Sequence, residues 1–107
     1  MIGHDPRHVS EKLLQGAVYD CARRLGYMAY HVFDARRSTP GFPDLVLIKP
    51  PRLIVAELKT EKGRLSAFQE VWLDKFRAID GVEVYVFRPA QWLSGEVEAI
   101  LRGEQTA

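Results

Sequence analysis

The sequence has few of the features that mark secreted and membrane proteins. Its single cysteine, Cys21, excludes an internal disulfide and fits a reducing cytosol. No stretch approaches the roughly 18 consecutive apolar residues of a membrane span. Residues 1–8 (MIGHDPRH) lack the apolar region of an export signal. We therefore expect a cytoplasmic protein.

The sequence also lacks several common catalytic and binding patterns. It has no glycine-rich phosphate loop, no Cys/His spacing of a zinc site and no Ser-His-Asp arrangement. The formal net charge is only +1, so a nucleic-acid interface would have to rest on local basic patches. The length of 107 residues suffices for one hydrophobic core. We expect one domain over residues 1–107, in which residues 1–9 and 103–107 are loose termini.

Apolar periodicity and turn residues predict an α/β domain with the element order α-β-β-β-α-β, followed by a terminal helix. The expected elements are a helix from 11 to about 25, a strand at 27–33, a hairpin at 43–58, a helix from 67 to about 78, a strand at 82–87 and a helix from 89 to about 101. Both faces of the hairpin are apolar. Its strands are therefore expected at the centre of a mixed sheet, with helices covering each face.

The hairpin carries three charged side chains where a fold alone would place none. If its turn is centred between its two prolines, Asp44 faces Glu57 across the two strands, and Lys59 projects on the same sheet face. Facing Cβ atoms are about 5 Å apart, so the two carboxylates repel each other. A divalent cation between the acids would relieve this repulsion. The alternative is an ordinary ion pair between Lys59 and Glu57, with Asp44 as a turn residue.

Two further side chains have both a structural and a functional interpretation. Glu11, in the first turn of the first helix, complements the helix dipole by roughly 0.3–1 kcal/mol. It also lies along the buried stripe of that helix, so it can point at the acids. Gln69 fits a capping box with Ser66, or it reaches the sheet beside Lys59. Both interpretations stay open for each residue.

Basic residues occupy the two loops that should flank the acids. They are Arg36, Arg37, Lys62 and Arg64. Loop cations are often merely solvated. Here they bracket the acids from both sides, which suits contact with the phosphate backbone of a nucleic acid approaching a bound cation.

This set of residues resembles the VRR-NUC branch of the PD-(D/E)XK nuclease superfamily. The resemblance rests on Gly41-Phe42-Pro43-Asp44, followed by Glu57-Leu58-Lys59 on the next strand. It extends to Glu11, residues 60–64 (TEKGR), Gln69 with Trp72, and Arg88-Pro89 after the last strand. It covers the chain from about Ser10 to Trp92.

The resemblance implies a restriction-endonuclease-like core and a DNA endonuclease that uses Mg²⁺ or Mn²⁺ to hydrolyse phosphodiester bonds. The implied metal ligands are Asp44, Glu57 and the backbone carbonyl of Leu58, with support from Glu11. Lys59 would position or activate the attacking water, and Gln69 is implied as an active-site residue.

Small free-standing proteins of this kind are associated with phage and bacterial genomes. They tend to be homodimers that act on branched DNA such as Holliday junctions. The resemblance therefore implies a homodimer in the cytoplasm of a bacterial or phage-infected host cell.

The alternative function is a DNA-junction or partner-binding module of the same fold with little or no turnover. The complete set of two acids and a lysine argues against it, because a pure binder gains nothing from carboxylates facing a phosphate. Divalent-metal titration separates the two: a nuclease cuts with Mg²⁺ or Mn²⁺ and stops with chelator, whereas a binder retains DNA equally in both.

Overall fold

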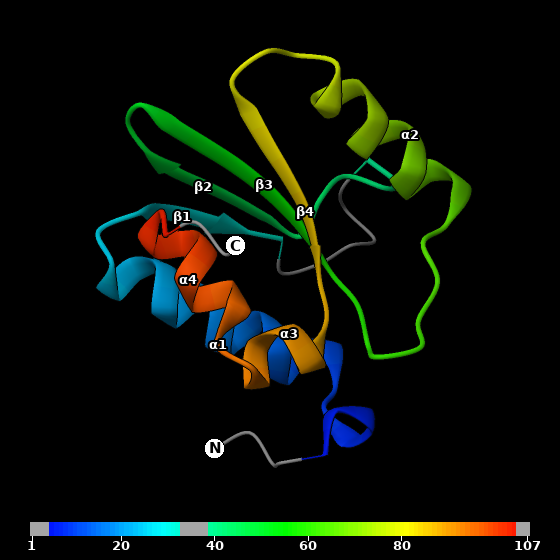
Figure 1. Cartoon of the computed structure of the whole chain (residues 1–107). Coiled ribbons are helices and arrows are strands. Elements are labelled where there is room, and N and C mark those ends of the chain that lie inside the picture. Colours follow the sequence, from blue (N-terminus) through cyan, green and yellow to red (C-terminus); the bar gives the residue numbers. More distant parts are fainter. Residues whose placement is uncertain (1–4, 33–38, 105–107) are drawn as a thin grey trace.

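The computed structural model describes residues 5–32 and 39–104 of the chain (Figure 1). The predicted order α-β-β-β-α-β is confirmed by the elements α1 to β4. The elements are a 3₁₀ helix η1 (Pro6–His8), α1 (Glu11–Arg24), β1 (Met28–His31), β2 (Leu45–Lys49), β3 (Arg52–Leu58), α2 (Ala67–Arg77), β4 (Val82–Phe87), α3 (Pro89–Leu93) and α4 (Glu96–Arg102).

The strands of the described residues form one mixed sheet in the order β1-β2-β3-β4. β1 and β3 each pair antiparallel with β2, whereas β4 runs parallel to β3. In the hairpin Val46 pairs with Val55 and Ile48 with Leu53. This is the register in which Asp44 would face Glu57. The central position predicted for the two hairpin strands is confirmed.

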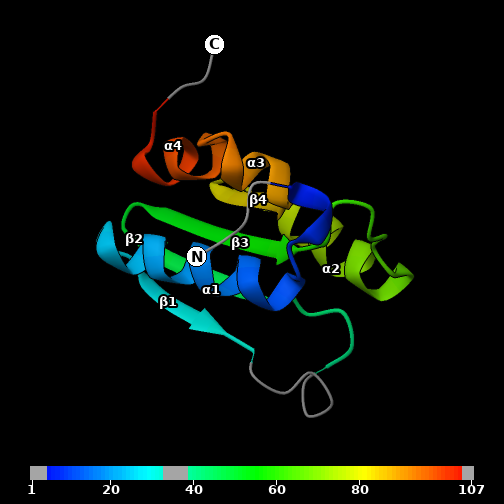
Figure 2. The same ribbon diagram turned by 90° about the horizontal axis from the view of Figure 1, so that it is seen from below.

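One face of the sheet holds the hydrophobic core. Figures 1 and 2 show α1, α3 and α4 together on this side, with α1 running alongside the strands. The core includes Leu14 and Val18 of α1, Leu45 and Leu47 of β2, Ile54 of β3, and Val97 and Leu101 of α4, all fully buried. The apolar stripe predicted for the first helix therefore faces the sheet, and Cys21 is a buried member of it.

The other face of the sheet is only partly covered. α2 lies on this side and packs against β4, as the two views show. Far from α2, the side chains of Met28, Tyr30 and Ile48 are 76%, 63% and 42% exposed. The sheet with flanking helices that the sequence predicts is confirmed, but the surface formed by Met28 and Tyr30 of β1 and Ile48 of β2 is left uncovered. The physical reason is that the helices beyond β4 return to the same side as α1.

Local capping signals place the predicted helix starts correctly. The Ser10 hydroxyl accepts a 3.1 Å hydrogen bond from the backbone N–H of Leu13 at the start of α1. Ser66 caps α2 in the same way, with a bond of 3.1 Å from the N–H of Gln69. In each case a side-chain oxygen satisfies a backbone donor that has no partner within the helix.

The helix expected from residue 89 to about 101 is instead two helices. α3 ends at Leu93 and α4 begins at Glu96, with Gly95 between them at φ +87°. A glycine adopts this left-handed conformation without the steric cost that other residues carry. The bend folds α4 onto the core. At the other end of the chain, η1 was not predicted, and Val9 next to it is buried rather than part of a loose terminus.

No helix within the described ranges combines the length and the apolar character that crossing a membrane requires.

Candidate active site

Asp44 stands one residue before β2 begins. Its Oδ2 accepts a 2.9 Å hydrogen bond from the backbone N–H of Leu58, and its backbone carbonyl accepts one of 3.2 Å from Val32. Asp44 is thereby tied to the ends of β1 and β3. Extending the hairpin register by one pair sets Asp44 opposite Glu57.

The segment that leads into Asp44 is held by aromatic side chains of α2. The indole Nε1 of Trp72 donates a 3.1 Å hydrogen bond to the carbonyl of Pro40. The ring of Phe42 packs edge to face against Trp72 and Phe76, at centroid distances of 5.2 and 6.2 Å. α2 therefore sets the path by which the chain enters the site. From the sequence, Trp72 was indicated only as part of a family resemblance, and its contacts with Pro40 and Phe42 were not predicted.

Gly41 makes this close approach possible. Its φ is +88°, and a Cβ at this position would lie 2.4 Å from the backbone carbon of Phe68. Any larger residue would push the loop away from α2 and displace the two residues that separate it from Asp44.

Glu57, at the end of β3, is a buried acid with an unsatisfied oxygen. Its exposed fraction is 1%, and among the described residues its Oε2 has no hydrogen-bond partner. Burial raises the pKa of Glu57, and the adjacent Asp44 carboxyl raises it further, to about 9. The charge of Lys59 acts in the opposite direction, and that of Glu11 adds to the rise. In the metal-free protein Glu57 therefore carries a proton at neutral pH, which lets two facing acids coexist.

Lys59 directly follows β3 and is 9% exposed. Its backbone N–H donates a 3.1 Å hydrogen bond to the carbonyl of Phe87 at the end of β4. Within the part of the chain that the structure describes, its ammonium forms no ion pair with Glu57 or Asp44. The structure thus differs from the simple ion-pair alternative. The positive charge of Lys59 lowers the pKa of Glu57 at a distance, without a direct ion pair.

The acids do not form a complete cage for a metal ion. Across residues 5–32 and 39–104, no three Asp, Glu, His or Cys side chains are arranged to hold one. Glu11 is exposed and reaches Glu57 only through its charge. The side-chain oxygen atoms found at this site are those of Asp44 and Glu57, and the carbonyl of Leu58 stays a predicted ligand. This small set fits Mg²⁺, which keeps several water ligands, and the unpartnered Oε2 of Glu57 is suited to a cation.

Comparison with known families agrees with this geometry. The family model of the VRR-NUC domain matches residues 6–91. The chain belongs to the VRR-NUC domain family. This family is a branch of the PD-(D/E)XK nucleases, so the chain is a nuclease domain whose substrate is DNA. No curated protein and no solved structure is similar enough to the chain to count as a match.

In this VRR-NUC domain Gln69 has a clear structural role. Its Oε1 accepts a 2.8 Å hydrogen bond from the backbone N–H of Ser66, and its own N–H donates to the Ser66 hydroxyl. The capping box proposed from the sequence is confirmed. Its implied role in the active site stays a prediction, which now depends on the side-chain NH₂ group alone.

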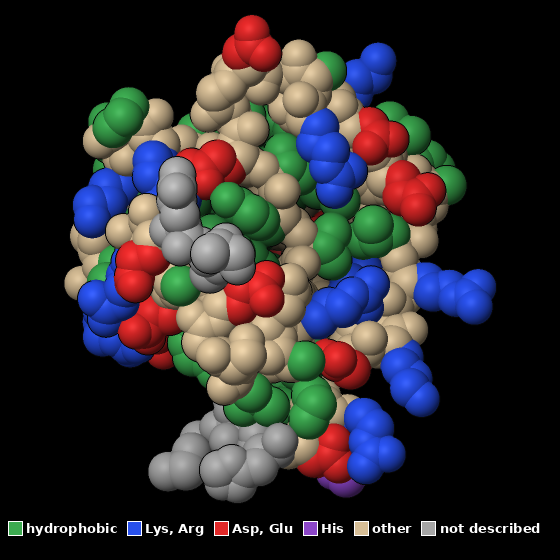
Figure 3. Space-filling model, in the orientation of Figure 1, with side chains coloured by type: hydrophobic (Ala, Val, Ile, Leu, Met, Phe, Trp, Pro, Cys, Tyr) green, Lys and Arg blue, Asp and Glu red, His purple; other side chains and the backbone are tan. Residues whose placement is uncertain are grey.

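Two of the four predicted DNA-binding cations lie in the described part of the VRR-NUC domain. Lys62 and Arg64 are exposed in the loop between β3 and α2. Figure 3 shows Lys and Arg side chains projecting from this loop and, below it, near η1. Arg36 and Arg37 lie outside the described residues, so their placement stays a prediction.

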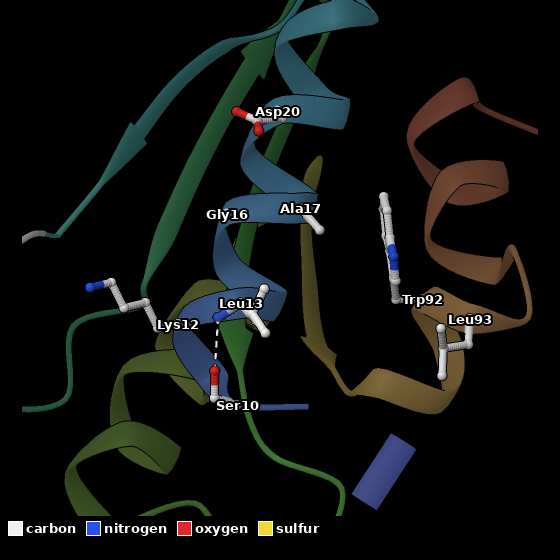
Figure 4. A pocket seen from close by; sticks show the side chains of 8 residues that line it. All are labelled: Ser10, Lys12, Leu13, Gly16, Ala17, Asp20, Trp92 and Leu93. Atoms are coloured by element: carbon white, nitrogen blue, oxygen red, sulfur yellow. Dashed lines mark hydrogen bonds between the residues drawn. The ribbon is translucent and has the colours of Figure 1, made fainter. Parts of the chain in front are cut away.

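A separate hollow of about 680 Å³ lies between α1 and α3 (Figure 4). Leu13, Trp92 and Leu93 give it apolar walls, with Lys12 and Asp20 at its rim. It contains none of the residues around Glu57. The candidate active site is therefore the acid pair at the ends of β2 and β3.

Proposed function

We propose that the protein is a Mg²⁺- or Mn²⁺-dependent endodeoxyribonuclease, selective for branched DNA such as Holliday junctions. The observation that carries this proposal is the buried, unpartnered carboxyl oxygen of Glu57 beside Asp44 and Lys59. A structural acid at this depth would be expected to be hydrogen-bonded or ion-paired. Burying the Glu57 oxygen without a partner therefore costs free energy, and a bound cation would remove that cost.

Asp44 and Glu57 would hold the metal, with the Leu58 carbonyl as a further ligand and Glu11 as outer support. When bound, the metal supplies positive charge at the scissile phosphate and makes a water easier to deprotonate. The N–H of Leu58 already fixes one oxygen of Asp44. This bond keeps the other oxygen oriented before a metal arrives.

Lys59 would orient the attacking water or stabilise the charge that develops on the phosphate. Within the described structure its ammonium has no ion-pair partner, so no other side chain neutralises its charge. Lys62 and Arg64, together with the predicted DNA-binding residues Arg36 and Arg37, would hold the DNA backbone on either side of the cut.

A homodimer would suit branched DNA, because a two-fold axis places two active sites on one four-way junction. The uncovered sheet surface around Met28, Tyr30 and Ile48 supports association with a second copy, since large apolar side chains exposed together mark interaction surfaces. Cys21 remains free, which is consistent with a cytoplasmic setting in a bacterial or phage-infected cell.

The test is cleavage of matched linear, nicked, flap and four-way DNA by the wild type, Glu57→Gln and Lys59→Ala. Each reaction is run with Mg²⁺, Mn²⁺ or chelator. We expect metal-dependent cutting of the branched substrates by the wild type alone. DNA binding that is equal with metal and with chelator, with no cutting of any substrate, would show a binding module instead. Equal cutting of linear and branched DNA would remove the structure selectivity only.

A further inference from the structure

The loop that follows Lys59 is wrapped around one guanidinium group. Arg88 Nη1 donates hydrogen bonds to the carbonyls of Thr60 and Gly63, each at 2.7 Å, and a longer one of 3.4 Å to Glu61. A single nitrogen atom thus gathers three backbone acceptors from four consecutive residues. Backbone carbonyls of an exposed loop are otherwise satisfied by water, so the convergence on one side chain is a specific constraint.

Neighbouring contacts tighten the same loop. The carboxylate of Glu61 accepts a 3.0 Å hydrogen bond from the N–H of Ala90 in the first turn of α3. The N–H of Gly63 donates to the Thr60 carbonyl at 3.2 Å. A Cβ on Gly63 would lie 2.7 Å from the Thr60 hydroxyl and 3.6 Å from Cδ of Lys59. The loop is therefore packed against the side chain of Lys59.

Arg88 is well placed for this role, because β3 and β4 are parallel and end together. Leu58 pairs with Phe87 at these ends, so Lys59 and Arg88 are the first residues beyond the two strands. The backbone of Arg88 is itself fixed, since its N–H donates a 2.9 Å hydrogen bond to the Gln91 side chain. The guanidinium therefore reaches the loop from a rigid base.

We propose that Arg88 is a positioning residue of the nuclease: by holding the Thr60–Gly63 loop it fixes Lys59 beside the acid pair and Lys62 toward the DNA backbone. Among the residues that the structure describes, Arg88 contacts neither Asp44 nor Glu57, so it acts through the loop alone. This inference rests on the proposed function for its activity readout. Its structural content, the restrained loop, can be measured without any substrate.

The test compares Arg88→Met, which removes the donors and keeps the aliphatic stem, with Arg88→Lys, which keeps one nitrogen donor. Arg52→Met is the matched control. Arg52 also makes several hydrogen bonds, but to Glu83, Tyr27 and Leu101 at the opposite end of β3. Melting curves set an assay temperature at which all variants are folded.

Three readouts are expected to move together in Arg88→Met. The cleavage rate at saturating DNA and metal falls roughly 10- to 100-fold, the cost of a small displacement of a reacting group. DNA binding weakens, and native-state tryptic cleavage after Lys62 and Arg64 becomes roughly tenfold faster, because the loop opens more often. The metal concentration for half-maximal rate stays unchanged, since other contacts hold Asp44 and Glu57. Arg88→Lys recovers most of the rate and of the protection.

A rate and a tryptic pattern in Arg88→Met that match the wild type would overturn the inference. So would an equal loss of rate in Arg52→Met at the same loss of melting temperature. If the wild type cuts no DNA, the proposed function fails, and the tryptic comparison alone then decides whether Arg88 restrains the loop. If the wild type cuts DNA and Arg88→Met is normal, only the positioning role fails.

Discussion

The two ends of β3 hold ionisable side chains in opposite ways. At its start, Arg52 donates two 2.7 Å hydrogen bonds to the carboxylate of Glu83, and the hydroxyl of Tyr85 donates a third of 2.8 Å to the same group. At its end, Glu57 has an oxygen without any partner among the described residues. The two glutamates lie on neighbouring strands of one sheet, yet only the first is fully satisfied.

This difference appears in their ionisation. Hydrogen bonding to Arg52 lowers the pKa of Glu83, so this group is ionised at neutral pH. Burial and Asp44 raise the pKa of Glu57 to about 9, so this group is protonated. An ion pair such as the first contributes to holding the sheet together. The buried, unpartnered Glu57 is instead destabilising unless a ligand binds to it. Buried groups with such strongly shifted pKa values are typical of functional sites, where stability is given up for activity.

The sharpest way to break the comparison is to neutralise each glutamate in turn. We expect Glu57→Gln, and likewise Asp44→Ala, to lower the cleavage rate by at least about 10³-fold, because the metal contributes several kcal/mol of transition-state stabilisation. The melting temperature of Glu57→Gln in metal-free buffer should hold or rise, since Gln resembles the protonated acid. Steady-state cleavage and thermal melts check both expectations.

The matched control is Glu83→Gln. It leaves the Arg52 guanidinium without its carboxylate and should cost roughly 1–3 kcal/mol of folding free energy, while cleavage below the melting transition stays near wild type. If Glu57→Gln were instead the strongly destabilised variant, the acid pair would be a structural element of the fold.

The second prediction concerns pH in metal-free, chelator-treated protein. The pKa of Glu57 is about 9 in the folded protein, whereas its ordinary value, which we take for the unfolded chain, is 4.5. Between these two pH values the folded protein holds a proton on Glu57 that the unfolded chain has released. The Glu57 contribution to stability is complete below pH 4.5 and is lost as the pH rises to about 9, at up to about 1.4 kcal/mol per pH unit. Denaturant unfolding of wild type minus Glu57→Gln should show this slope.

Glu83 behaves in the opposite direction. Its pKa is lowered, so its contribution is complete at neutral pH and is lost as the pH falls through its folded-state pKa. The difference between wild type and Glu83→Gln should therefore shrink only in acid. If the stability difference between wild type and Glu57→Gln varied with pH in the same way as that between wild type and Glu83→Gln, the pKa values of the two glutamates would be shifted in the same direction, contrary to this prediction.

Much of this arrangement follows from local sequence. The alternation of the hairpin and its Pro-Pro turn determine the register, and Ser10 and Ser66 determine where α1 and α2 begin. The hairpin register and the helix starts depend on residues a few positions apart, so they can be predicted from short stretches of the sequence. Asp44 and Glu57 could be placed opposite each other for the same reason.

The features that were missed depend on contacts between distant segments. Arg88 donates to carbonyls that lie 25 to 28 residues away in the sequence. The Arg-Pro pair itself gives no indication of which carbonyls these are. The uncovered sheet surface depends on which side the last helices take, which strand patterns do not specify. The break at Ser94-Gly95 was the exception, because this pair is a recognisable breaker.

The third prediction is that Mg²⁺ raises the melting temperature of the wild type. A ligand that binds only the folded state stabilises it by RT ln(1 + [L]/Kd), about 2.7 kcal/mol at 100 times Kd. The rise should vanish in Glu57→Gln and persist in Glu83→Gln. A wild-type melting temperature unaffected by millimolar Mg²⁺ would contradict a metal site at the acid pair.

The smallest effect on cleavage is expected from the exposed cations of the loop that follows the Glu57 end of β3. Lys62 and Arg64 are exposed in the loop that follows Lys59, and in the proposed function they contact only the flanking DNA backbone. Each phosphate contact on duplex DNA adds about 0.9 to the slope of log affinity against log salt. Lys62→Ala and Arg64→Ala should therefore flatten this slope by about one contact each and weaken binding to all sequences alike, while saturated single-turnover cleavage changes far less than in Lys59→Ala.

Arg102→Ala provides the control for these variants, because Arg102 is an exposed cation paired with Glu98 on α4, away from the acids. Removing it should leave the salt slope unchanged. A variant of Lys62 or Arg64 that kept the wild-type affinity and slope but lost saturated turnover would belong with Lys59 in the chemical step. The boundary between the buried reacting groups and the exposed DNA-holding groups would then lie further along the loop than Lys59.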